Sequence, residues 1–171
     1  MDARLRRLQE AMDAAIRGLG SQQLAQAPPG KWSAAQILEH LFLTYTGTIK
    51  GCERCLQSEK PLGDRPTLGQ RVRLLVVVQA GYMPRGVQAP ERTRPKGTPA
   101  EVVVAEIGGK IAAMDELIAQ CEGRHGKRAQ LMNHPVLGPM TGEQWRRFHF
   151  VHGMHHVRQI LRMREGVRRE M

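Results

Sequence analysis

Four histidines lie close together in the stretch 149–160, which reads HFVHGMHHVRQI. The chain has seven histidines in all, so this segment holds most of them. In an α-helix, His152 and His156 would lie about 40° apart on one face, where two imidazoles commonly bind a single metal ion. His149 and His155 lie about 60° to either side of His152, which predicts a place at the rim of such a site or in contact with the ligands.

A third ligand is expected from elsewhere, because a catalytic metal usually has three protein ligands and one open position. His40, in the stretch ILEHLFL, is the candidate, since it lies near the apolar face of its own helical segment. A hydrogen bond to a backbone carbonyl would explain His40 if it stood alone. Two inward-facing histidines on another helix favour a ligand instead, because unpartnered buried imidazoles cost free energy. The predicted metal ligands are therefore His40, His152 and His156.

Other side chains are expected to contribute to a pocket or to contact the ligands, and they are Gln159, Arg158, His134 and Thr44. Glu39 lies about 100° around the helix from His40 and is predicted to face solvent. The helix lacks the Glu of an H-E-x-x-H motif, which argues against a metalloprotease. The C-x-x-C pair Cys52 and Cys55 falls inside a predicted helix, so buried core thiols are favoured over a redox or metal site.

Three neutral imidazoles would suit Zn²⁺ or Ni²⁺ best, with Fe²⁺ as a further option. Such an ion lowers the pKa of a bound water or thiol and can hold it deprotonated. The chemistry predicted is therefore activation of a nucleophile at a divalent metal. The net charge of +10 favours an anionic or electrophilic small-molecule substrate. Basic residues in the linker, Arg92, Arg94 and Lys96, are expected over the mouth of the site.

Helices must position these histidines, and their starts are marked by capping boxes, in which a Ser or Thr is followed three residues later by Gln or Glu. The pattern occurs at Ser33–Gln36, Thr67–Gln70, Thr98–Glu101 and Thr141–Gln144. Apolar spacing predicts long helices over about 5–19, 34–57, 99–121 and 142–165. A short extra helix is predicted around 67–80, with a buried strand at 74–78 as the alternative. The expected fold is an all-α four-helix bundle with long inter-helix connections that allow crossovers.

Length and composition agree with one soluble domain over residues 1–171. No apolar run is long enough for a membrane span, and the first residues lack the apolar core of a secretory signal. Three cysteines are too few and too badly spaced for a disulfide framework, so a cytoplasmic location is expected. The basic residues are dispersed and accompany no nucleic-acid motif, so a solvated surface is favoured over a nucleic-acid partner.

The motifs resemble the DinB/YfiT-like superfamily. KWSAAQILEHL is similar to the family's Trp, helix-cap and His stretch, and HPVLGPMTGEQWRRFHFVHGMHHVRQI is similar to its final helix. The resemblance covers residues 3–165 and implies a four-helix bundle with His40, His152 and His156 as metal ligands. It also implies a homodimer, and in some members a metal-dependent transferase or isomerase that uses a low-molecular-weight thiol.

Three functions remain open at this point. The first is a metal-dependent enzyme, such as a thiol-dependent S-transferase, an isomerase or a hydrolase. The second is a non-catalytic metal-binding or stress-related interaction bundle. The third is a nucleic-acid-associated protein, suggested by the positive charge and the family's name.

Overall fold

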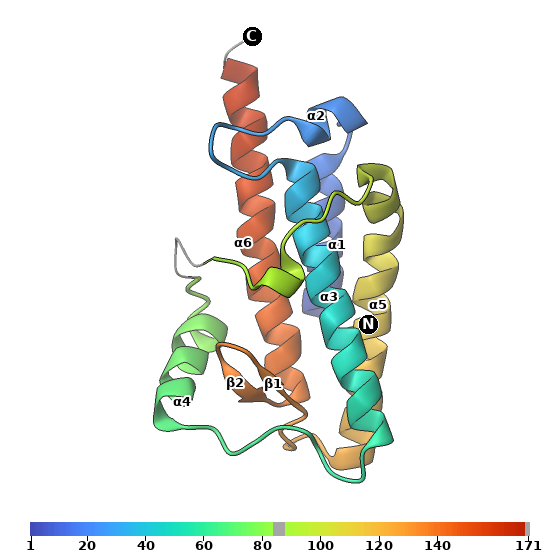
Figure 1. The fold of residues 1–171 in the computed structure, drawn as a ribbon, viewed down its shortest axis with the longest axis vertical. Helices are drawn as coiled ribbons and strands as arrows, with labels where there is room; N and C mark the ends of the chain where they lie inside the picture. Colours follow the sequence, from blue (N-terminus) through green and yellow to red (C-terminus); the bar gives the residue numbers. More distant parts are fainter. Residues whose placement is uncertain (84–87, 170–171) are drawn as a thin grey trace.

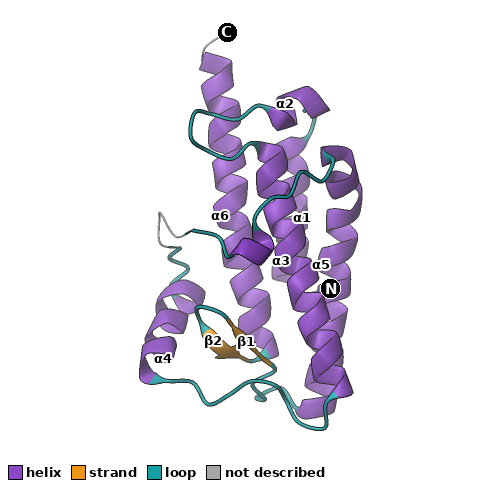
Figure 2. Cartoon of the chain, in the orientation of Figure 1, coloured by secondary structure: helices purple, strands orange, loops and turns teal. Residues whose placement is uncertain are grey.

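Four long helices dominate the computed structural model, which describes residues 1–83 and 88–169 (Figure 1). They are α1 (Ala3–Ile16), α3 (Ala34–Gln57), α5 (Ala100–His125) and α6 (Gly142–Arg169). The smaller elements are α2 (Ser21–Ala25), α4 (Leu68–Leu74), the π-helical turn η1 (Leu75–Gln79), the 3₁₀ turn η2 (Glu91–Thr93) and the strands β1 (Met132–His134) and β2 (Gly138–Met140). Figure 2 shows how little of the chain is strand, and the all-α expectation is confirmed.

The long helices pack chiefly as two pairs, α1 against α6 and α3 against α5. Figure 1 shows that α3 and α5 run in the same direction, opposite to α1 and α6. The chain therefore returns from the far end of α3 to the near end of α5 along a connection over 58–99. The long connections were expected to allow crossovers, and this one makes a crossover that carries α4, η1 and η2 along the outside of the long helices. The connection from α5 to α6 makes none, since α6 begins at the end where α5 stops.

Three of the four predicted capping boxes are confirmed. Ser33 and Gln36 exchange hydrogen bonds of 2.9 and 3.2 Å between side chain and backbone, and the boxes at Thr67 and Thr141 have the same reciprocal pattern. The capping box predicted at Thr98 does not form. The hydroxyl of Thr98 donates to Glu39 over 2.6 Å, and α5 begins at Ala100 behind Pro99 without a side-chain cap.

Two segments in the middle of the chain bear on the predictions, residues 68–79 and the hairpin of β1 and β2. Residues 68–79 form the predicted short helix, α4 continued by η1, so the strand alternative for 74–78 is wrong. The hairpin of β1 and β2 was not predicted. It is antiparallel, with Met132 opposite Met140 and His134 opposite Gly138, and it leads directly into α6.

The core is built mainly from aliphatic and sulfur-containing side chains. Cys52, Cys55 and Cys121 are fully buried within it, which confirms the prediction of core thiols for the C-x-x-C pair. Burial raises the pKa of Cys121 to about 11, so this thiol stays protonated and inert at neutral pH. Among the described residues, no helix is both long and apolar enough to cross a bilayer.

Ion pairs fasten α6 to α5 at the end where α6 begins. Arg146 lies within 2.5 Å of a carboxylate oxygen of Asp115 and 2.8 Å of one of Glu122, and all three side chains are mostly buried. Asp115 also accepts a hydrogen bond from the backbone of Asp2, which joins the start of α1 to this network.

Removing Arg146 should be costly, because two mostly buried carboxylates lose the guanidinium that they share. We expect Arg146→Met to lower the free energy of unfolding by roughly 3 kcal/mol, within the range for breaking buried ion pairs. Denaturant unfolding measures the change. Arg124→Met is a suitable control, because its guanidinium is exposed and hydrogen-bonds a backbone carbonyl, that of Ser58. Equal losses in both variants would contradict the assignment of the network.

Candidate metal centre

Three imidazoles converge between α3 and α6. Nε2 of His152 lies 3.2 Å from Nε2 of His40 and 3.1 Å from Nε2 of His156, and the ligand atoms of all three lie within 4.8 Å of one another. A tetrahedral ion with bonds of about 2.0–2.1 Å to nitrogen separates its ligand atoms by about 3.3 Å. The three histidines predicted as ligands are thus brought together with a spacing that suits one metal ion.

The hydrogen bonds behind two of the rings leave their Nε2 atoms free to bind a metal. His40 donates from Nδ1 to the backbone carbonyl of Thr93 over 2.7 Å, and a carbonyl can only accept. His156 donates from Nδ1 to the side-chain oxygen of Gln159, also over 2.7 Å. Both rings therefore present Nε2 lone pairs to the centre, where a cation would offset their mutual repulsion. Nδ1 of His152 is buried and has no hydrogen-bond partner among the described residues.

Burial keeps the three rings neutral, which is the form that binds metal. His40 and His156 are 4% and 8% exposed. Burial lowers the pKa of His156 to about 3, and it also lowers the pKa of His40 and, well below the usual value, that of His152. None of the three needs to lose a proton at neutral pH before a metal ion binds.

Gln159 is the predicted residue that most directly supports a ligand. Its side chain contacts His156 through the oxygen and His155 through the nitrogen, over 2.7 and 3.1 Å. His155 is half-buried beside His156, in agreement with its expected place next to a ligand. Arg158, in contrast, is exposed on α6. The hydroxyl of Thr44 donates to the backbone carbonyl of His40 and has no hydrogen bond to its imidazole.

His149 does not lie at a rim, because its ring is fully buried. The hydroxyl of Thr48 donates to the carbonyl of Thr44 over 3.3 Å, so it accepts from Nε2 of His149 over 3.0 Å. The rings of Tyr45 and Trp145 pack against His149, with centroids 5.4 and 5.7 Å away. Burial lowers the pKa of His149 to about 3. The helical angle gave its direction correctly, but the sequence did not show that aromatic rings fill that side.

His134 lies in β1, in the extended conformation that a following proline favours. Its Nδ1 accepts hydrogen bonds from the backbone of Val136 and Leu137, which closes the turn of the hairpin. Burial lowers its pKa to about 4. Its ring packs against Phe148, which in turn stacks on His152 at 5.4 Å with nearly parallel planes. His134 is therefore separated from the ligands by one aromatic ring.

Glu39 is buried, and the prediction that it faces solvent is wrong. Only 2% of it is exposed. Its carboxylate accepts hydrogen bonds from the segment Lys96–Thr98, which passes over the start of α3. The available signal was the run Lys-Gly-Thr at 96–98. Its glycine marks a turn, and the backbone N–H groups of a turn can bind a carboxylate because no helix or strand uses them. The side chains of Arg92, Arg94 and Lys96 are exposed, and Arg94 hydrogen-bonds within its own loop.

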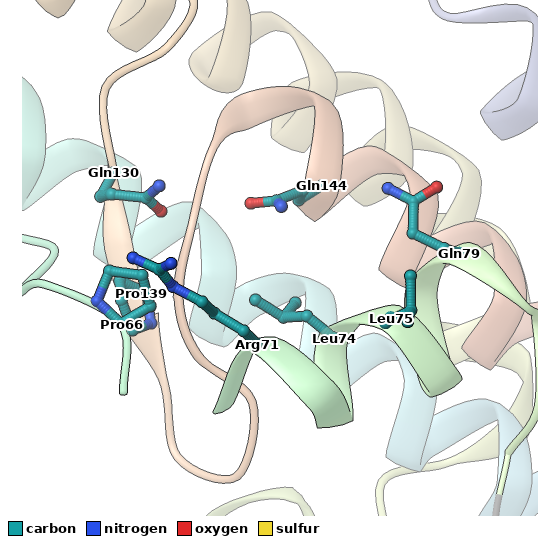
Figure 3. A pocket seen from close by; sticks show the side chains of 8 residues that line it. All are labelled: Pro66, Arg71, Leu74, Leu75, Gln79, Gln130, Pro139 and Gln144. Carbon is teal, nitrogen blue, oxygen red and sulfur yellow. The ribbon is translucent and has the colours of Figure 1, made fainter. Parts of the chain in front are cut away.

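A separate cleft of about 380 Å³ lies between α4, the hairpin and the start of α6 (Figure 3). It is lined by Pro66, Arg71, Leu74, Leu75, Gln79, Gln130, Pro139 and Gln144. None of the three clustered histidines belongs to this lining. The cleft at the surface is therefore separate from the histidine cluster in the interior.

Fold and site together define a mostly helical protein with a three-histidine cluster able to hold a divalent metal ion. Residues 1–163 match the family described as "Protein of unknown function (DUF1569)", and the chain belongs to that family. No curated protein and no solved structure matches the chain.

Proposed function

We propose that the protein is a metal-dependent enzyme that activates a small nucleophile at a site formed by His40, His152 and His156. The observation that carries the proposal is the convergence of three neutral imidazoles on one point, two of them with Nδ1 engaged behind the ring. We also propose that the four long helices belong to the DinB/YfiT type, on the motifs around His40 and in α6.

Zn²⁺ or Ni²⁺ is the proposed ion, with Fe²⁺ as a further option, because neutral imidazole suits all three. When bound, the ion would supply a Lewis acid that lowers the pKa of a coordinated water or thiol. The chain's own contribution is to orient the rings. Thr93 fixes the tautomer of His40, Gln159 fixes that of His156, and Phe148 holds the plane of His152.

The proposed substrate is a small anionic or electrophilic molecule, and the proposed co-substrate is a low-molecular-weight thiol. Transfer to the thiol, isomerisation and hydrolysis are the reaction classes considered. The excess of positive charge supports an anionic substrate. The thiol rests on the family resemblance alone.

A non-catalytic metal-binding bundle is the second candidate, and one observation favours it. The ligands are closely packed, and the described cleft is lined by none of them. A closed coordination shell is typical of structural metal sites, whereas catalytic sites keep an open position.

A homodimer in the cytoplasm is the proposed state of the protein. Several apolar side chains of α4 and η1 are exposed, among them Leu68, Val72 and Leu75, and such a face is typical of a contact surface. Light scattering on purified protein tests the dimer. A nucleic-acid partner is less favoured, and an affinity for DNA that falls steeply with salt would support it.

Metal analysis of untagged protein, coupled to a screen of thiols with electrophiles, tests the proposed function. We expect about one Zn²⁺ or Ni²⁺ per chain and thiol consumption that stops when the metal is chelated. Metal without any turnover would favour the non-catalytic bundle. Protein without metal after reconstitution would overturn both candidates.

A further inference from the structure

The Glu39 carboxylate is buried at the start of α3, and the chain satisfies its charge with hydrogen bonds. Backbone N–H groups of Lys96, Gly97 and Thr98 donate to it over 3.0, 3.1 and 3.0 Å, and the Thr98 hydroxyl donates over 2.6 Å. Charge-assisted bonds of this kind are about twice as strong as neutral ones. These hydrogen bonds outweigh the effect of burial and lower the pKa of Glu39, so it is ionised at neutral pH.

These donors belong to a segment that also hydrogen-bonds His40, one of the proposed metal ligands. We call residues 91–98 the strap. It begins with η2, which packs against α3, and it ends at the Glu39 carboxylate. Thr93, the last residue of η2, presents its carbonyl to Nδ1 of His40 over 2.7 Å. Figure 1 shows the strap passing over α3 near the start of that helix. Glu39 and His40 are adjacent in α3, so one helix turn contacts the strap at two places.

We propose that Glu39 is a positioning residue for the metal site, which acts by holding the strap so that the Thr93 carbonyl fixes the tautomer and the ring orientation of His40. The proposal rests on the metal site put forward above. Groups behind a ligating histidine of this kind typically change metal affinity by 10- to 100-fold when they are removed. Here the group behind the ligand is a backbone carbonyl, which no substitution of Thr93 itself can delete, so its support must come from elsewhere.

Two other roles for Glu39 fit the contacts less well. A metal ligand would need a free oxygen directed to the cluster, but both carboxylate oxygens are engaged by the strap. A general base would need access to substrate and a pKa near the working pH, but Glu39 is buried and its pKa is lowered. Glu39 therefore acts through its hydrogen bonds to the strap.

The test compares Glu39→Gln and Thr98→Val with two controls. Glu39→Gln keeps the shape but places an NH₂ group against backbone donors, and Thr98→Val removes only the 2.6 Å hydroxyl bond. Glu101→Gln removes an exposed acid next to the strap. Arg146→Met destabilises the fold at a distant ion-pair network without contacting the strap. If Glu39→Gln does not fold, Thr98→Val carries the test.

Two measurements are made on each variant. The first is Zn²⁺ affinity by chelator competition, where we expect a 10- to 100-fold loss for Glu39→Gln, a smaller loss for Thr98→Val and no change for the controls. The second is the ¹⁵N NMR spectrum of the metal-free imidazoles. We expect His40 protonated at Nδ1 in the wild type and a mixture of tautomers in Glu39→Gln.

The two readouts separate the possible failures. If the wild type binds no Zn²⁺, the proposed function fails, and the NMR tautomer still decides whether Glu39 positions His40. If the wild type binds Zn²⁺ and both strap variants keep its affinity and the Nδ1–H tautomer, the positioning role is overturned. A loss of affinity in Arg146→Met equal to that in Glu39→Gln would also overturn it, because the effect would then follow stability alone.

Discussion

Saturating Zn²⁺ or Ni²⁺ should raise the melting temperature of the metal-free protein by roughly 8–16 °C. A ligand at a thousand times its dissociation constant stabilises the folded state by about 4 kcal/mol. In a chain of this size each kcal/mol shifts the melting temperature by about 2–4 °C. Because two histidines cannot hold the ion as three do, His40→Ala, His152→Ala and His156→Ala should each lose most of this rise. Differential scanning calorimetry with and without metal measures it.

His125→Ala is the control for general metal binding by histidine. His125 lies at the end of α5, where its ring contacts the backbone carbonyl of Cys55. Cys55 is near the end of α3, whereas His40 of the cluster is near its start. This variant should keep the full rise in melting temperature. If the three ligand variants keep it as well, the ion binds elsewhere and the assignment of ligands is wrong.

Acid should begin to destabilise the metal-free protein near pH 6.5, above the range in which carboxylates titrate. Burial lowers the pKa of His149 to about 3, against about 6.5 in an unfolded chain. Between these values the unfolded state binds one proton more than the folded state, so stability rises with pH. The contribution of neutral His149 is complete above pH 6.5 and is lost at about 1.4 kcal/mol per pH unit as the pH falls toward 3.

Denaturant unfolding between pH 7 and 4, with a chelator present, tests this dependence. We expect His149→Phe to reduce the slope of stability against pH by about 1.4 kcal/mol per unit, because the titrating group is gone. Thr48→Val is the matched control. It removes the hydrogen-bond partner of His149 but keeps the imidazole, so it should lower stability and retain the slope. An unchanged slope in His149→Phe would show that other groups control acid unfolding.

The parts of the fold that were predictable are those set by local chemistry. The boxes at Ser33 and Thr141 need only a side chain and the backbone three residues away, and both formed as expected. The pair His152 and His156 follows from helical geometry alone. His40 required the further argument that inward histidines need a common partner, and the close approach of the Nε2 atoms agrees with it.

The errors arose where a distant segment competes with a local pattern. Thr98 has the sequence of a helix cap, but the Glu39 carboxylate takes its hydroxyl, and no spacing rule contains a partner 59 residues away. His149 was predicted at the rim or in contact with the ligands. It is instead buried against Tyr45 and Thr48, which come from another helix and could not be foreseen from local spacing. The hairpin of β1 and β2 has strands of three residues each, too short for an alternating pattern to be recognised.

The parallel course of α3 and α5 also has a consequence for how the protein matures. His40 and His152 are separated by 112 residues, and the crossover that brings the Thr93 carbonyl to His40 lies between them. Contacts of such long sequence separation form late, because the loop must close before they contribute. During synthesis the N-terminal segments emerge first. A ribosome-bound chain that already contains α1 and α3 thus offers a metal ion one imidazole only. The three ligands of the proposed metal site are therefore together only after α6 has been released from the ribosome.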